Sequence, residues 1–178
     1  MKTNPNENYK YIHHAFVREL DSMLHLLQKA IDFCKEKNMD QSTLMATKLA
    51  PDMFDFRKQV QVFTDNVAGG VARGAGMAKP SMPDTENTLE ELLTRTQKTK
   101  DFILSVDPEK VVGVEDVKVK LPWMSEGMFF DAHTYIGDFV MQNATFHLCM
   151  VYAILRNQGM QMGKQDYMGP LEMKNEKA

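Results

Sequence analysis

Apolar residues recur every three or four positions over several long stretches of the chain, which is the period of an amphipathic helix. The first stretch covers residues 12–37, and Asn38 is a suitable stop because asparagine tolerates the left-handed conformation at a helix end. Asp40 can cap a short helix that ends near Leu49, before Pro51 breaks the pattern. We therefore expect a long helix followed by a short one.

A second long helix is expected over residues 54–74. Its last part reads AGGVARGAG, and each glycine weakens a helix by about 1 kcal/mol relative to alanine. Close approach of another helix is the explanation that we favour, with a bound ligand as the alternative. After a loop with two prolines, Asp84 or Thr85 can cap a third long helix that ends near Ser105.

The period then changes from helical to alternating. Residues 117–121 alternate apolar and charged side chains, which predicts a strand, and residues 128–130 can supply its partner in a small hairpin. Asp131 is placed to cap a final helix that extends to about residue 158, with Gly159 at its C-terminal end. The predicted fold is all-α: a four-helix bundle with a short extra helix and a small β-hairpin before the last helix.

Composition and charge narrow the function. The 178 residues are 43% hydrophobic and 25% charged, typical of one compact domain over residues 1–178, with a disordered tail expected from about 170 to 178. Twenty-one Lys and Arg against 24 Asp and Glu disfavour nucleic acid as a ligand. The chain has no run of about 18 apolar residues, so no membrane span is predicted. Its two cysteines are far apart and form no CxxC pair, which favours a reducing compartment. We therefore expect a cytoplasmic protein.

Candidate chemistry lies where polar residues interrupt an apolar stripe. Asn143 and His147, one turn apart, do so on the last helix, and Gln61 and Asp65 form a similar pair on the second long helix. A buried polar group without a partner costs about 1 to 3 kcal/mol, so we expect the two pairs to converge. Such a cluster would suit a structural network, a small-molecule pocket, or a weak metal site with His147 and Asp65 as candidate ligands.

Four segments carry a resemblance to a known family. They are APDMF at 50–54, QVQ at 59–61, FH and YAILR within 146–156, and GKQDY at 163–167. Together they resemble an uncharacterised family in the DinB/YfiT-like superfamily of four-helix bundles. The resemblance implies a DinB-like bundle that forms a homodimer.

The same resemblance bears on the site. In related enzymes three histidines bind a divalent metal, two of them from an HxxxH pair on the last helix. This chain is similar there but has Asn143 and His147, with Gln61 or Asp65 on the second long helix. We therefore expect a DinB-like protein that binds a small molecule in an internal pocket near Asn143 and His147, without established catalysis. The alternative is a hydrolase or thiol transferase that uses Zn, Ni or Mn at a degenerate site.

Overall fold

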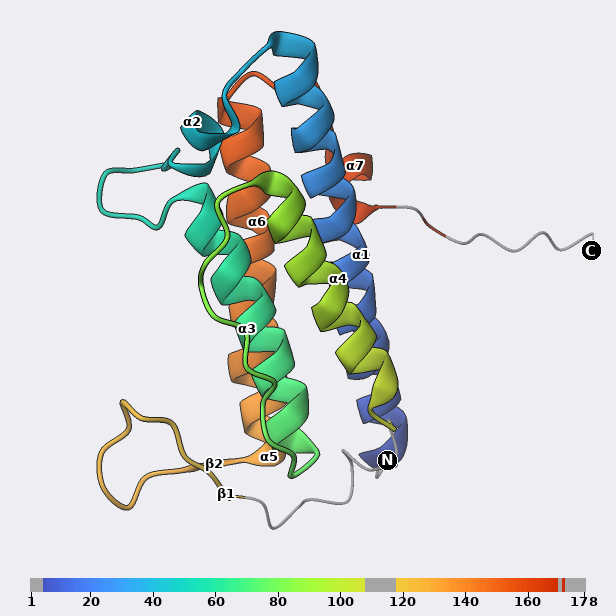
Figure 1. Ribbon diagram of the computed structural model, residues 1–178. Coiled ribbons are helices and arrows are strands. Elements are labelled where there is room, and N and C mark those ends of the chain that lie inside the picture. Colours follow the sequence, from blue (N-terminus) through green and yellow to red (C-terminus); the bar gives the residue numbers. More distant parts are fainter. Residues whose placement is uncertain (1–4, 108–117, 170, 172–178) are drawn as a thin grey trace, which may run out of the picture.

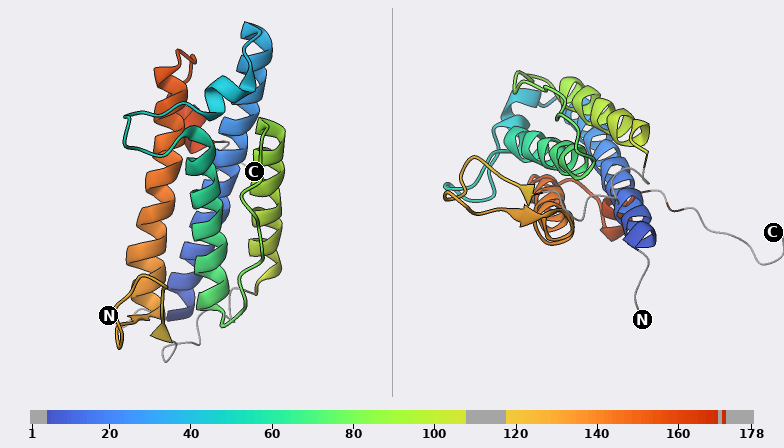
Figure 2. Two further views of the ribbon diagram at one scale, coloured as in Figure 1. Left: turned by 60° about the vertical axis from the view of Figure 1, so that its left-hand side comes forward. Right: turned by 90° about the horizontal axis from the view of Figure 1, so that it is seen from below.

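Four long helices run side by side in the computed structural model, which describes residues 5–107, 118–169 and 171 (Figure 1). They are α1 (Pro5–Lys37), α3 (Phe56–Gly74), α4 (Leu89–Ser105) and α6 (Met141–Asn157). Helix α1 packs against α4 and α6, and α3 packs against the same two helices. The predicted all-α four-helix bundle is confirmed, and the end-on view in Figure 2 shows the four helices at the corners of a square.

The core is filled by the apolar stripes of these helices. Its largest fully buried side chains include Phe16, Leu20, Phe63, Leu92 and Ile103. Full burial of such a side chain contributes about 1.5 to 3 kcal/mol, so the periodic apolar positions account for the association of the helices. No helix in the described part of the chain combines the length and the apolar character needed to cross a membrane.

The segment between α1 and α3 follows the prediction in part. Asn38 has φ of 49°, the left-handed value expected of a helix stop. Asp40 caps the short helix α2 (Gln41–Met45) by accepting a hydrogen bond from the Ser42 amide. Helix α2 ends earlier than the expected residue 49 because the chain after it becomes extended. There the backbone of Lys48 pairs with that of Asp55 in an isolated antiparallel β-bridge.

Helix α4 begins later than predicted. Thr88, and neither Asp84 nor Thr85, is its N-cap: the Thr88 hydroxyl accepts from the Glu91 amide, and the Glu91 carboxylate accepts from the Thr88 amide. This reciprocal pair is a capping box. The Asp84 carboxylate is engaged elsewhere, by Lys58 and Arg95.

The predicted hairpin is present but short. Strand β1 (Lys118–Val119) pairs antiparallel with β2 (Phe130–Asp131), and residue 117 of the prediction lies outside the described residues. As predicted, Asp131 caps the helix that follows, α5 (Ala132–Thr134), by accepting a hydrogen bond from the Thr134 amide. The last helix was expected to be continuous, but a π-helical segment, η1 (Tyr135–Val140), separates α5 from α6.

Side chains of α3 hold this π-helical segment in place. Asn66 Nδ2 donates to the Val140 carbonyl at 3.0 Å, and Arg73 Nη1 donates to the Tyr135 hydroxyl at 3.0 Å. A Cβ atom at Gly70 would lie 2.5 Å from Val140 Cγ1, far inside van der Waals contact. Close helix approach is therefore confirmed as the reason for this glycine.

A further short helix, α7 (Lys164–Met168), was not predicted from the sequence. It lies against α1 and beside α6, in the seam between these two helices (Figure 2). The expected disordered tail falls largely on residues 170 and 172–178, which lie outside the described residues.

Candidate functional site

Three of the four segments that carry the family resemblance meet around His147. The ring of His147 stacks on Phe54 with centroids 6.4 Å apart and makes a T-shaped contact with the Phe146 ring, with centroids 5.3 Å apart. Gln59 Oε1 lies 2.6 Å from His147 Nδ1. We call these four residues the His147 cluster. Phe54 precedes α3, Gln59 lies in its first turn, and Phe146 and His147 lie on α6.

The hydrogen bonds of Gln59 determine the protonation of the imidazole. Gln59 Nε2 donates to the Phe54 carbonyl at 3.2 Å, so its oxygen is the atom that faces His147. An amide oxygen can only accept, and His147 Nδ1 must therefore carry the proton and donate it. In the neutral ring this leaves Nε2 unprotonated, with a lone pair available.

His147 is neutral at pH 7, because burial lowers its pKa from the usual value of 6.5. Nε2 makes no hydrogen bond to a described residue. It is not closed off from solvent. The half-exposed rings of Phe54 and Phe146 flank the imidazole. The cluster therefore presents a hydrogen-bond acceptor between two apolar rings.

The structure brings together only some of the predicted site residues. Asn143 lies one turn before His147 on α6, is half-buried, and makes no hydrogen bond to a described residue. Gln61 and Asp65 point to the other side of α3, where Gln61 donates to Glu86 and Asp65 accepts from Arg95. The partner of His147 is Gln59, where the sequence led us to expect Gln61 or Asp65.

Helix geometry explains this difference. Residues two positions apart on a helix point in directions about 200° apart, so Gln59 and Gln61 cannot face the same neighbour. The α3 residues that hydrogen-bond to, or closely approach, the last helix or the π-helical segment before it include Gln59, Asn66, Gly70 and Arg73. Gln61 and Asp65 belong to the stripe that faces α4 and the loop before it.

An open groove of about 580 Å³ adjoins the His147 cluster. Phe54, which stacks on His147, is also part of the groove wall. The remaining lining carries basic and acidic side chains in equal number together with a methionine and an amide: Lys48, Asp52, Met53, Asp55, Arg57, Lys58, Gln61 and Asp84. The groove is therefore polar and without strong net charge, with an aromatic face on the side of His147.

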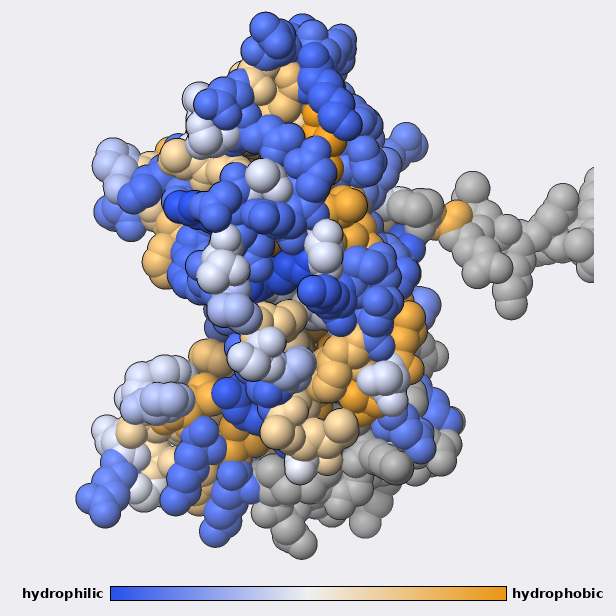
Figure 3. All heavy atoms as spheres, viewed as in Figure 1, coloured by the Kyte–Doolittle hydropathy of each residue, from blue (hydrophilic) through white to orange (hydrophobic). Residues whose placement is uncertain are grey.

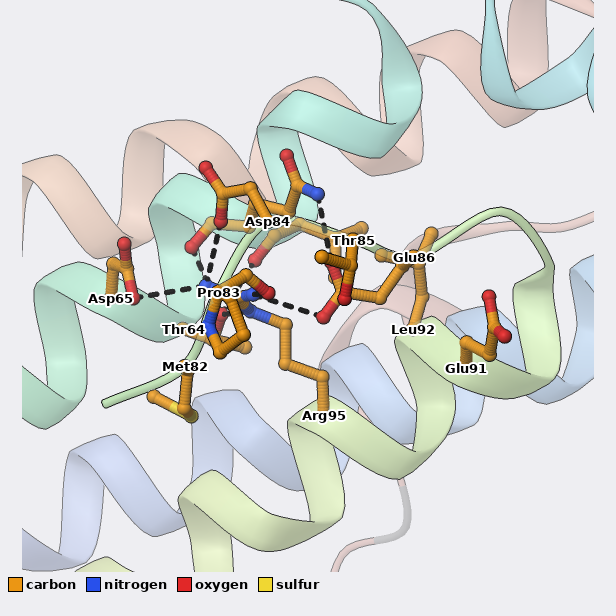
Figure 4. Close-up of polar contacts among 12 residues, drawn as sticks. Thr64, Asp65, Met82, Pro83, Asp84, Thr85, Glu86, Glu91, Leu92 and Arg95 are labelled. Atoms are coloured by element: carbon orange, nitrogen blue, oxygen red, sulfur yellow. Dashed lines mark hydrogen bonds and ion pairs between the residues drawn. The ribbon is translucent and has the colours of Figure 1, made fainter. Parts of the chain in front are cut away.

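On the far side of α3, a buried arginine organises the loop between α3 and α4. Arg95 of α4 is only 3% exposed. Its guanidinium points from α4 toward α3 and the loop (Figure 4). It contacts Thr64 Oγ1 at 2.8 Å, the Pro83 carbonyl at 3.1 Å, Glu86 at 2.9 Å, Asp65 at 2.9 Å and Asp84 at 3.0 Å. A guanidinium has five N–H donors, so this set of contacts can satisfy all of them.

Two lysines balance the charge around Arg95. Lys79 pairs with Asp65 at 2.8 Å and Lys58 pairs with Asp84 at 2.6 Å. Burial raises the pKa of Asp84, but Lys58 and Arg95 together outweigh it and hold this pKa below its usual value. Three basic and three acidic side chains, with Glu86 as the third acid, thus form a compact ion network that binds the loop to α3 and α4.

Arg95 was not predicted from the sequence as a candidate residue. The residue lies within the apolar stripe of α4, between Leu92 and Thr99, and all three side chains are buried. An arginine on a buried stripe requires acidic partners. The DTENT segment at 84–88 contains two such acids, so this pairing was the signal that could have identified the network.

The donor set does not fit a divalent metal. His147 Nε2 keeps a lone pair, but Asp65 lies on the opposite side of α3 in contact with Arg95 and Lys79. Within residues 5–107, 118–169 and 171, no three His, Cys, Asp or Glu side chains are grouped so that they could hold a metal ion. An amide such as that of Asn143 is a weak substitute for a histidine ligand of Zn or Ni. The predicted metal ligands His147 and Asp65 therefore do not lie together.

Fold and site together define a DinB-like helical-bundle protein. The chain is similar to the crystal structure of a DinB family member protein from Shewanella denitrificans, with a TM-score of 0.88 and 27% identity over 96% of this chain and 97% of that chain. The chain belongs to the family described as a domain of unknown function (DUF1993), which matches residues 9–168. None of the curated proteins matches it. The resemblance seen in the sequence is confirmed.

We expect the substitution His147→Ala to lower the free energy of unfolding by about 1 to 2 kcal/mol at pH 7, because it leaves Gln59 Oε1 buried without its donor. Urea unfolding followed by circular dichroism measures this difference. His133 is exposed and serves as the control, with an expected change of less than about 0.5 kcal/mol for His133→Ala. Equal changes for the two variants would contradict the structural role of His147.

Proposed function

We propose that this protein binds a small molecule at the His147 cluster and in the groove beside it. The observation that carries the proposal is the Nε2 of a neutral His147, which makes no hydrogen bond to a described residue and is flanked by the half-exposed rings of Phe54 and Phe146. A polar atom in such a position gains a hydrogen bond when a ligand donates to it.

The chemistry of the cluster defines the kind of ligand. An acceptor nitrogen selects a hydroxyl or N–H group, and the two phenyl rings select an apolar or aromatic portion next to that group. The groove beyond Phe54 offers side chains of both charge signs, so polar substituents of either sign can be paired there. We therefore propose a neutral or zwitterionic small molecule with a donor group on an apolar or aromatic framework.

Binding of small phenols and aromatic amines, measured by ligand-observed NMR, tests this proposal. We expect affinity to fall at least about tenfold in His147→Phe, which keeps an aromatic ring but removes Nε2, since a lost hydrogen bond of this kind costs about 1.4 kcal/mol. His133→Phe is the matched control and should bind as the wild type does. Equal binding by wild type and His147→Phe would refute the proposed role of Nε2.

We also propose that the protein forms a homodimer. The family resemblance supports this state, and large apolar side chains reach the surface next to the hairpin and along α6. Trp123 is 64% exposed, Phe129 is 44% exposed and Phe146 is 50% exposed. Figure 3 shows hydrophobic side chains on the surface near the hairpin, where the outline of the molecule is hollowed. Exposed apolar surface of this kind favours association with a second copy.

Sedimentation at micromolar concentration tests the dimer. We expect a species of twice the 20.4 kDa chain mass, and we expect Trp123→Ser to shift the equilibrium toward the monomer. Leu104 on α4 is 56% exposed and provides the control substitution Leu104→Ser. A single species at the chain mass for the wild type would exclude the dimer under these conditions.

A further inference from the structure

A carboxyl group is enclosed in the seam between α1 and α6, on a different face of α6 from His147. Glu19 Oε1 of α1 accepts a hydrogen bond from Thr145 Oγ1 of α6 at 2.5 Å. Its second oxygen, Oε2, is closed off from solvent and has no hydrogen-bond partner among the described residues. An ionised carboxylate needs donors for both oxygens, so this environment suits the protonated acid better than the anion.

Helix α7 covers the same seam through Tyr167. Its hydroxyl accepts a hydrogen bond from Cys149 Sγ of α6 at 3.3 Å, and its ring meets Tyr152 edge-on with centroids 5.7 Å apart. Burial raises the pKa of Tyr167, and the nearby Glu19 charge adds to that effect. Tyr167 and Glu19 are therefore close enough to interact electrostatically, with Tyr167 remaining neutral.

The outer side of α7 is attached to α1 by polar contacts. Asp166 pairs with Lys29 at 2.9 Å and lies 3.6 Å from His25 Nε2, and Arg18 donates to the Met168 carbonyl at 2.8 Å. The Lys29 hydrogen bond is the largest of the effects that lower the pKa of Asp166 to about 2, so Asp166 stays ionised from pH 6 to pH 8. These contacts are partly solvated, and each one contributes little to the docking of α7.

We propose that Glu19 acts as a proton-controlled latch for α7: the helix stays docked while the carboxyl is protonated and detaches more often once it is ionised. Detachment admits water to the seam, which removes the cost of a buried anion. Among the described residues, the ionisable group that interacts with Glu19 is Tyr167 of α7, which in turn accepts a hydrogen bond from Cys149 of α6. Asp166 lies on the outer side of α7, where it contacts His25 and Lys29 of α1.

The difference in the Glu19 pKa between the docked and detached states sets the direction and size of the pH effect on α7 docking. Burial raises the pKa of Glu19 to about 7, with the Thr145 hydrogen bond acting in the opposite direction, whereas a carboxyl in contact with water ionises near 4.5. Between these values the docked state holds more protons than the detached state, so raising the pH favours detachment. From pH 6 to pH 8 the opening equilibrium should increase by up to about tenfold, and it should level off above that range.

Hydrogen exchange of the α7 amides in the full-length chain tests this latch. At each pH, the ratio of the wild-type exchange rate to that of Glu19→Gln cancels the chemical effect of pH on exchange. We expect this ratio to rise up to about tenfold between pH 6 and pH 8, because the amide of the variant does not ionise. The amides of α3 provide an internal reference that should not follow this trend.

Two further variants make the outcome specific. His25→Gln should keep the pH dependence of the wild type, whereas loss of the dependence in this variant would assign the effect to His25 and overturn the proposal. Thr145→Val removes the hydrogen bond that lowers the pKa of Glu19 and should therefore move the transition to higher pH. This variant keeps Glu19, and its α7 exchange measured relative to the α3 amides tests the latch even if Glu19→Gln folds poorly. A ratio that is constant from pH 6 to pH 8, or an unmoved transition in Thr145→Val, would refute the latch.

Discussion

Replacing Arg95 by methionine should lower the free energy of unfolding by about 3 kcal/mol or more, the largest single-site loss that we expect. The substitution keeps an unbranched side chain of similar reach but removes the cation between α3, α4 and the loop. Glu86 is left largely buried without its ion partner, and the Thr64 hydroxyl loses the N–H donor that it accepts from. Urea unfolding at pH 7 measures the loss.

The same substitution at Arg57 is the matched control. Arg57 is 41% exposed and lies 3.9 Å from Asp55, so Arg57→Met should change stability by less than about 0.5 kcal/mol. Arg95→Lys should recover only part of the loss, because one ammonium group cannot replace the planar set of donors. If Arg95→Met were no more damaging than Arg57→Met, the ion network would not stabilise the fold.

The substitution Gly70→Ala should cost about 2 to 3 kcal/mol, although alanine favours a helix more than glycine does. The added methyl group would meet Cγ1 of Val140 at 2.5 Å and Cγ2 at 2.9 Å. Val140 is fully buried and branched at Cβ, so it has no flexible end that can move aside. The clash must therefore separate α3 from the π-helical segment, and a lower unfolding midpoint in urea reports it.

Gly137 provides the control for this prediction. It lies in the same π-helical segment, and a Cβ atom there would have no neighbour within 4 Å, so Gly137→Ala should not destabilise the protein. The double variant Gly70→Ala/Val140→Ala should lose less free energy of unfolding than the sum of the two single losses. The smaller side chain at position 140 makes room for the methyl group at position 70, and that methyl group fills part of the space left by valine. Additive losses would show that close packing is not what requires Gly70.

Much of the fold could be predicted from the sequence because the long helices bury a continuous apolar stripe. The period of three and four identified α1, α3, α4 and α6, and Asp40 and Asp131 were recognised as caps. Helix α1 begins earlier than expected, at Pro5 and not near residue 12, and α6 begins only at Met141, after the π-helical segment. The N-cap of α4 was placed too early because Asp84, a good cap by residue type, is held by Lys58 and Arg95. Local sequence does not reveal such competition between tertiary partners.

The π-helical segment and α7 were missed for related reasons. The π-helical segment depends on Asn66 and Gly70 of α3, residues distant in sequence that bind and accommodate Val140. Helix α7 is too short to show a period, and it depends on contacts with α1 such as Asp166 to Lys29. These elements are determined by tertiary contacts, which no window of neighbouring residues contains.

Only part of the surroundings of His147 could be predicted from the sequence. His147 was correctly placed on a buried stripe of α6, and its need for a hydrogen-bond partner was correctly inferred. The partner was assigned to the wrong stripe of α3, because several of its faces are buried and apolar periodicity alone cannot tell which of them meets α6. Gln59 and Asn66 mark that face in the structure, whereas Gln61 and Asp65 mark the face toward α4.

The most direct test of the account is chemical-shift mapping of the bound small molecule. Phenols and aromatic amines that bind in the ligand-observed experiment are titrated into ¹⁵N-labelled protein, and the backbone and His147 ring signals are followed. We predict that the largest shifts cluster at residues 52–61 and 143–147, and that the resonance of His147 Nε2 moves on binding while Nδ1 keeps its proton. Shifts confined to other surfaces, with an unchanged His147 Nε2, would contradict a ligand site at the His147 cluster.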